Sequence, residues 1–168
     1  MNDQTLDDLL IGKPLTPEQA TVAFRKALEE LGESQSGLAS RMQRLGDKRP
    51  FANILRNIQR MASGETRVSG EMEALLEMLN RERRRARFEA EILPWTSIGN
   101  GCVASKVRDF TITLTAQSRG RWHINLVHQD GYSPPWPSWQ DSLEEAKIKA
   151  LICLDDAILD LQRIQHMG

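Results

Sequence analysis

Residues 31–63 decide the fold of the first half of the chain; their sequence is LGESQSGLASRMQRLGDKRPFANILRNIQRMAS. Apolar residues recur in it at helical spacing on both sides of the break Gly46-Asp47. The stretch therefore predicts two short helices, one over Gln35–Leu45 after the capping residue Ser34 and one that begins at Pro50. The expected apolar faces are Leu38, Ala39, Met42 and Leu45 in the first helix, and Phe51, Ile54, Leu55, Ile58 and Met61 in the second.

A predicted helix flanks this pair on each side. Thr16-Pro17-Glu18-Gln19 combines a capping box with a proline at the first helical position, and Gly32 ends the helix that follows. Ser69 caps a fourth helix, which becomes very basic over Arg81–Arg87. That run indicates either a solvated helical linker, which we favour, or a phosphate contact. The expected buried side of the fourth helix is Met72, Leu75, Leu76 and Leu79.

Beyond Pro94 the pattern changes to that of strands. The turn Asn100-Gly101 predicts pairing of Trp95–Ile98 with Cys102–Val107. Two further runs alternate apolar and polar residues, Phe110–Thr115 and Trp122–Leu126, and so predict a β-meander. Ser142–Glu145 is a capping box that opens a last helix. The expected core face of that helix is Ala146, Ala150, Leu151, Leu154, Ile158 and Leu161.

The expected fold class is α+β, with an N-terminal helical bundle followed by a small antiparallel β-meander packed by a C-terminal helix. We expect a flexible arm over residues 1–14, a helical domain with a basic extension over 15–92, and a β-β-β-α domain for dimerisation or partner binding over 93–168. Three apolar residues off the main face of the last helix suggest a second apolar contact, which a homodimer would supply. They are Ile148, Ile152 and Leu159.

Composition excludes several classes of protein. The 168 residues are 40% hydrophobic and 27% charged, which is typical of a globular protein. A net charge of −1 argues against a uniformly basic nucleic-acid coat and against an acidic DNA mimic. No apolar run approaches the ~20 residues that cross a bilayer. The start Met1–Gln4 does not resemble a signal peptide. We expect a cytoplasmic protein without a membrane partner, in which Cys102 and Cys153 are buried thiols.

The sequence offers little for catalysis. His123, His128 and His166 show no metal-ligand spacing with the cysteines. The acidic residues of the last helix, Asp155 to Asp160, have no accompanying phosphate loop, so a solvated acidic face is favoured over a Mg²⁺ site. We expect no enzyme activity, no metal and no cofactor.

Positive charge is concentrated in residues 41–60, which hold six basic side chains against Asp47, a net charge of +5. No acidic residue occurs from Lys48 to Ser63. Arginine, asparagine and glutamine on the outer face of the third helix are the side chains that bind base edges, and nearby basic residues neutralise phosphates. The alternative is an ordinary solvated face. The candidate DNA contacts are Gln35, Arg41, Arg44, Lys48, Arg49, Asn53, Arg56, Asn57, Gln59 and Arg60.

The order of these motifs resembles the Xre/lambda-repressor-like helix-turn-helix family over about residues 17–80. Leu31–Ala39 is similar to the start of that motif, and Ile58–Glu65 to the end of its recognition helix and the turn after it. The resemblance implies a transcriptional regulator of bacterial or phage type, expected to be a repressor. Its third helix would lie in the major groove of double-stranded DNA, and a homodimer would bind two half-sites. The connection 43–50 is longer than the tight turn of the family.

A second hypothesis concerns the loop 133–139, which is rich in proline and tryptophan. Exposed aromatic side chains often mark recognition surfaces, although these rings can also close the end of a thin core. The chain would then be an interaction protein, such as an antitoxin or a phage inhibitor of a host complex. Trp136 and Trp139 are the candidate partner-binding residues.

Overall fold

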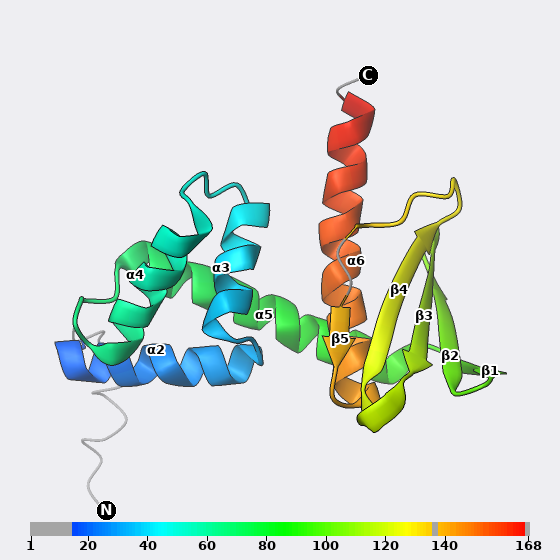
Figure 1. The fold of residues 1–168 in the computed structure, drawn as a ribbon, viewed down its shortest axis with the longest axis horizontal. Coiled ribbons are helices and arrows are strands. Elements are labelled where there is room, and N and C mark those ends of the chain that lie inside the picture. The colour runs from blue at the N-terminus through cyan, green and yellow to red at the C-terminus, as the bar shows by residue number, and fades with distance from the viewer. Residues whose placement is uncertain (1–14, 136–137, 167–168) are drawn as a thin grey trace, which may run out of the picture. The chain divides into compact units, whose positions relative to one another are not determined.

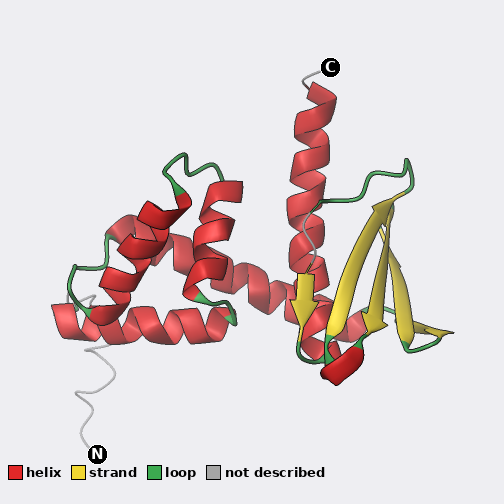
Figure 2. Ribbon diagram, in the orientation of Figure 1, coloured by secondary structure: helices red, strands yellow, loops and turns green. Residues whose placement is uncertain are grey.

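The structure is a computed structural model that describes residues 15–135 and 138–166. The expected arm over residues 1–14 and the candidate Trp136 lie outside the described residues. The α+β fold class is confirmed, because helices precede a five-stranded antiparallel sheet and one further helix follows it (Figures 1 and 2). The chain divides into two compact units, Met1–Asn80 and Arg81–Gly168.

The first unit contains helices α2 (Pro17–Leu31), α3 (Gln35–Arg44), α4 (Phe51–Ser63) and the start of α5 (Gly70–Ile92). The predicted capping box is confirmed, since the Thr16 hydroxyl accepts from the Gln19 amide and the Gln19 side chain accepts from the Thr16 amide. Ser34 and Ser69 cap α3 and α5 as expected. Local capping chemistry therefore fixes where three of these helices begin.

One apolar core joins the four helical segments of this unit. Two side-chain bonds add to it: Arg25 Nε donates to the Ala62 carbonyl at 2.6 Å, and Asn80 Nδ2 donates to the Ala27 carbonyl at 3.1 Å. These bonds connect α2 to the end of α4 and to α5. The core thereby holds α4 by its inner face and leaves its outer face uncovered. Its largest members are Phe24, Leu28, Leu31, Leu38, Met42, Ile54, Ile58, Met61, Met72, Leu76 and Leu79.

The connection between α3 and α4 differs from the sequence prediction at both ends. α3 stops at Arg44, and Leu45 is 40% exposed rather than buried. Pro50 is the residue before α4 rather than its first residue, and Phe51 is 37% exposed. Both apolar residues lie beside the loop, Leu45 directly after α3 and Phe51 as the first residue of α4. Periodicity alone overestimated the apolar face at these two positions.

The second unit contains a meander and its covering helix. The strands are β1 (Thr96–Gly99), β2 (Cys102–Val107), β3 (Phe110–Ala116), β4 (Trp122–His128) and β5 (Ser138–Gln140), with a short 3-10 turn at Ser118–Gly120 and helix α6 (Leu143–His166). Neighbouring strands pair antiparallel in chain order, as the sequence predicted for the first four. β5 was not predicted; it pairs with β4 from within the expected loop.

The core of the second unit lies between the sheet and α6 (Figure 1). Ala86 and Ala90 of α5 belong to this core, so the division falls at Asn80–Arg81 rather than near Pro94. Ile148 and Ile152 are 1% and 2% exposed in the same core. The inference of a dimer contact from these two residues is therefore wrong, because the chain itself covers them. Leu159 remains exposed.

Candidate nucleic-acid interface

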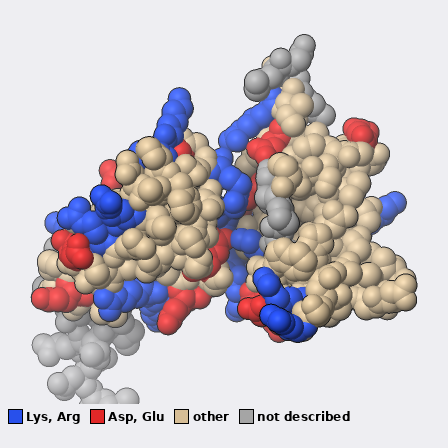
Figure 3. Space-filling model, in the orientation of Figure 1, with Lys and Arg blue, Asp and Glu red and all other residues tan. Residues whose placement is uncertain are grey.

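The outer face of α4 is polar and accessible. Asn53, Arg56, Gln59 and Arg60 are exposed, and Asn57 is half-buried, while Ile54, Ile58 and Met61 point into the core on the other side. The helical period separates the two sets, so every candidate base-reading side chain of α4 lies away from the apolar face. Figure 3 shows lysine and arginine side chains gathered over parts of this unit.

The charge on this face is only partly neutralised. Among the described residues, Lys48 and Arg56 have no ion-pair partner. Arg60 Nε lies 3.4 Å from Glu65 Oε2, and both side chains are at least half exposed. Such an exposed pair stabilises weakly and exchanges readily with water or a phosphate. The α4 surface thus presents net positive charge.

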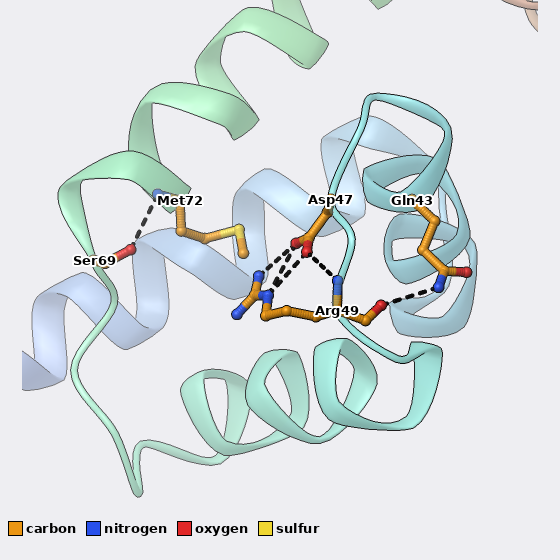
Figure 4. Close-up of polar contacts among 5 residues, drawn as sticks. All are labelled: Gln43, Asp47, Arg49, Ser69 and Met72. Atoms are coloured by element: carbon orange, nitrogen blue, oxygen red, sulfur yellow. Dashed lines mark hydrogen bonds and ion pairs between the residues drawn. The ribbon is translucent and has the colours of Figure 1, made fainter.

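The loop before α4 holds an internal ion pair (Figure 4). Arg49 Nη2 lies 2.5 Å from Asp47 Oδ2, the Arg49 amide donates to Asp47 Oδ1 at 3.0 Å, and Gln43 Nε2 donates to the Arg49 carbonyl at 3.2 Å. The Arg49 side-chain and backbone hydrogen bonds lower the pKa of Asp47, and the same carboxylate raises the pKa of Arg49. Arg49 is therefore paired within the loop while its side chain is half exposed, and its expected role as a phosphate neutraliser stays a prediction.

The prediction that Arg41 contacts DNA is wrong, because its side chain is buried. This residue is 1% exposed, and its Nη1 lies 3.5 Å from Oε1 of Glu33, whose side chain is 9% exposed. A guanidinium inside the core cannot reach a DNA phosphate without unfolding its surroundings. Arg41 is a structural residue that supports α3, and Glu33 compensates its charge.

The remaining candidates of α3 are less exposed than those of α4. Gln35 is half-buried in the first turn of α3, where the Ser34 hydroxyl accepts from the Gly37 amide at 3.0 Å. Arg44 is half-buried in the last turn. Both lie near the ends of α3, and Nε of Arg44 is buried.

Sequence reasoning missed Arg67, which is exposed in the loop between α4 and α5. It has no ion-pair partner among the described residues. The only available signal was its position just after the Gly64-Glu65 turn, outside the basic window 41–60. Arg67 adds an exposed positive charge to the first unit.

The basic run of α5 is only partly a solvated face, since Arg83 is buried while its other arginines are exposed. Arg83 is 8% exposed and donates to both carboxylate oxygens of Glu145, at 2.9 and 2.7 Å. Arg85 pairs with Asp155, which also lies 3.6 Å from Arg108. Asp155 therefore belongs to an ion-pair cluster at the surface of the expected acidic face. Intramolecular carboxylates pair with Arg83 and Arg85, so these two arginines are less available to a phosphate than Arg56 of α4.

The part of the chain that the structure describes contains both cysteines and side chains of the types that ligate metals. Neither cysteine forms a disulfide; Cys153 is buried, as expected, whereas Cys102 is only half-buried. No group of three or more histidine, cysteine, aspartate or glutamate side chains is placed to hold a metal within residues 15–135 and 138–166. Within the same ranges, no helix combines the length and apolar character that a membrane span needs.

Trp139 is the one partner-binding candidate that lies within the described residues. It is 42% exposed on β5, and its ring centroid is 4.6 Å from that of His123 on β4. The hypothesis that this region binds a protein stays a prediction.

Comparisons of the chain with protein-family models, with curated proteins and with solved structures found no match.

Proposed function

We propose that the chain is a sequence-specific DNA-binding transcriptional regulator whose helix α4 enters the major groove. The observation that supports this most is the outer face of α4: five polar or basic side chains, no acidic residue from Lys48 to Ser63, and a buried apolar face behind them. A recognition helix needs both faces, since the core fixes its position and the outer face contacts base edges.

Each accessible side chain suits a specific contact. Arg56 and Arg60 can each bind guanine through two hydrogen bonds, and Asn53, Asn57 and Gln59 have the donor and acceptor pair that matches adenine. Lys48, Arg44, Arg67 and Gln35 would contact phosphates and set the position of the protein on the duplex without reading sequence.

The proposal includes a homodimer, because two copies can bind two half-sites about one helical turn apart. Phe88 and Ile92 support a self-association surface, since they are 63% and 65% exposed and lie four residues apart on α5. We propose a repressor of bacterial or phage type that acts in the cytoplasm, where a reducing environment suits two cysteines that form no disulfide. Sedimentation of the wild type and of Phe88→Ser/Ile92→Ser tests the dimer; equal masses would contradict this surface.

Selection of binding sites from a random duplex pool, followed by fluorescence anisotropy over a salt series, tests the function. We expect one enriched site and binding that weakens steeply with salt. Arg56→Ala/Arg60→Ala should reduce affinity about 100-fold, since each bidentate contact is worth about 1–3 kcal/mol. The matched control Lys26→Ala/Lys106→Ala removes the same charge from exposed positions outside the proposed interface. Equal affinities of the two double variants would contradict the proposal.

A further inference from the structure

We propose that the second unit binds a nucleotide in a surface cavity beside the β3–β4 connection. The cavity has a volume of about 290 Å³ and is lined by Gln117, Ser118, Arg119, Arg121 and Trp139. Two guanidinium groups, one indole ring, one amide and one hydroxyl therefore surround a single space. No acidic side chain lines it. This combination suits an anion that also has a flat ring.

The connection that holds the two arginines is closed by backbone bonds. The Gln117 amide donates to the Arg121 carbonyl at 2.7 Å, directly after the last register pair of β3 and β4, Ala116 and Trp122. Arg119 has a φ of 66°, a left-handed conformation that a side chain other than glycine rarely adopts. The loop thus fixes the backbone positions of both arginines before a ligand arrives, which reduces the backbone entropy lost on binding.

The indole ring of Trp139 is also positioned by its neighbours. Trp139 pairs in register with His123, and their ring centroids are 4.6 Å apart at an angle of 51°. The guanidinium carbon of Arg121 lies 5.5 Å from the Trp139 ring centroid. Even with these contacts, Trp139 remains 42% exposed. Its free surface contributes to the wall of the cavity.

The two cations are available to a ligand. Arg119 is exposed and has no ion-pair partner among the described residues. Arg121 Nε is 4.0 Å from Asp141 Oδ1, and the Asp141 side chain is 99% exposed, so this pair is weak. Guanidinium groups bind phosphate through paired hydrogen bonds, and an exposed indole stacks on any nucleobase. The base would therefore lie against Trp139 and the phosphate between Arg119 and Arg121.

A protein partner is a less suitable occupant. A protein that docks on an exposed tryptophan typically covers an apolar patch, whereas four of the five residues that line this cavity are polar or basic. Binding at this cavity does not depend on α4, so its test is separate from that of DNA binding.

Isothermal titration calorimetry of the full chain tests the proposal, with adenosine monophosphate, adenosine and inorganic phosphate at one ionic strength. Because the site combines a stacking surface with an anion site, we expect the nucleotide to bind at least about tenfold more tightly than either part. No measurable binding of the nucleotide would overturn the proposal. Phosphate that binds as tightly as the nucleotide would overturn it as well, because the ring would then contribute nothing.

Variants locate the binding. Arg119→Gly removes the guanidinium at a position whose φ glycine adopts freely, so the loop keeps its conformation. We expect it and Trp139→Ala each to weaken nucleotide binding about tenfold, and Trp139→Phe to keep most of the affinity. The control Lys106→Ala removes a charge elsewhere on the sheet. Equal affinity of Arg119→Gly, Trp139→Ala and the wild type would overturn the site, as would a copurifying protein lost in Trp139→Ala without any nucleotide binding.

Two further titrations separate the source of the nucleotide from the DNA-binding proposal. Thymidine monophosphate and a single-stranded oligothymidylate of four nucleotides share the ring and the phosphate. Much tighter binding of the oligomer would indicate that the ligand of the cavity is a nucleic-acid strand. Similar binding of the two would indicate a free nucleotide. Lys26→Ala, at an exposed position outside α4 and outside the cavity, should leave both affinities unchanged. A chain that binds nucleotides but no duplex would contradict only the function proposed for α4.

Discussion

Arg56 and Arg83 both lie in basic runs on amphipathic helices, yet the fold uses them differently. Arg56 is exposed on α4 without an ion-pair partner among the described residues. Arg83 is 8% exposed on α5, and its guanidinium binds both oxygens of Glu145. The positive charge counted along a sequence is therefore not the charge that a partner meets. Only charges without an internal carboxylate contribute fully to a phosphate-binding surface.

The same difference occurs within residues 41–60. Arg41 is compensated by Glu33 inside the core, and Arg49 by Asp47 in the loop. The side chains that remain accessible belong mainly to α4 and to Lys48. The proposed interface is smaller than the sequence window, and it is centred on one helix.

The largest effect is expected for Arg41→Ala. The substitution leaves the Glu33 carboxylate, 9% exposed, without the Arg41 guanidinium. We expect the free energy of unfolding to fall by about 3–5 kcal/mol in urea titrations. The control Arg56→Ala should change it by less than about 0.5 kcal/mol, because that side chain is on the surface. If Arg41→Ala and Arg56→Ala have the same free energy of unfolding, burial does not distinguish the contributions of these two arginines to stability.

A smaller loss of stability is expected for Glu145→Ala in the second unit. The variant leaves the Arg83 guanidinium, whose side chain is 10% exposed, without its carboxylate. The expected cost is about 2 kcal/mol, less than for Arg41→Ala because a long arginine side chain can shift toward water. Glu144→Ala is the matched control, since Glu144 is exposed one residue earlier. A Glu145→Ala protein as stable as this control would show that the pair adds nothing.

The sequence predicted most of the local structure, because the signals are local. Side-chain caps at Thr16, Ser34 and Ser69 placed three helix starts, and Asn100-Gly101 placed a hairpin whose turn has φ of 50° and 70° at these residues. Strand alternation identified β3 and β4. Each of these patterns is contained within a few consecutive residues.

The features that were missed depend on contacts far apart in the chain. β5 is three residues long and follows a proline-rich stretch, so only its pairing with β4 defines it. The second core reaches Ala86 and Ala90, whose small side chains give a weak periodic signal. Arg83 and Glu145 are 62 positions apart, and no linear pattern connects them. For the candidate site, the exposed face of α4 followed from periodicity, whereas the neutralisation of its neighbours did not.

Lys48→Ala and Arg56→Ala should separate phosphate contacts from base contacts. Arg56→Ala is expected to weaken binding to the selected site about tenfold and to relax the preference at one base pair. Lys48→Ala should weaken all sequences alike and reduce the slope of log affinity against log salt by about 1. Anisotropy titrations with the selected site and with scrambled DNA measure both. A base preference that is lost in Lys48→Ala and kept in Arg56→Ala would reverse the roles assigned here.

The smallest effect is expected for Asp47→Asn, which releases a compensated arginine at the proposed interface. Hydrogen bonds from Arg49 lower the pKa of Asp47 below its ordinary value of 3.8. A carboxyl whose folded pKa is lowered stabilises the fold above its unfolded pKa, and this contribution is lost as the pH falls through the folded value. Asp47→Asn should therefore be slightly less stable than the wild type at pH 7, and this difference should shrink below pH 3.8.

The same substitution should raise DNA affinity a few-fold, because it removes a negative charge and frees the Arg49 guanidinium near the phosphates. Asp109→Asn is the control, since it changes the net charge equally at an exposed position of the second unit. Stability and affinity would then change in opposite directions at one ion pair. A loss of stability together with a gain in DNA affinity would show that the ion pair with Asp47 keeps Arg49 from binding DNA. The opposite outcome is a fall of both DNA affinity and stability in Asp47→Asn. Arg49 would then act on DNA only through the loop conformation that Asp47 maintains. In that case the ion pair between Asp47 and Arg49 does not limit the positive charge of the proposed interface.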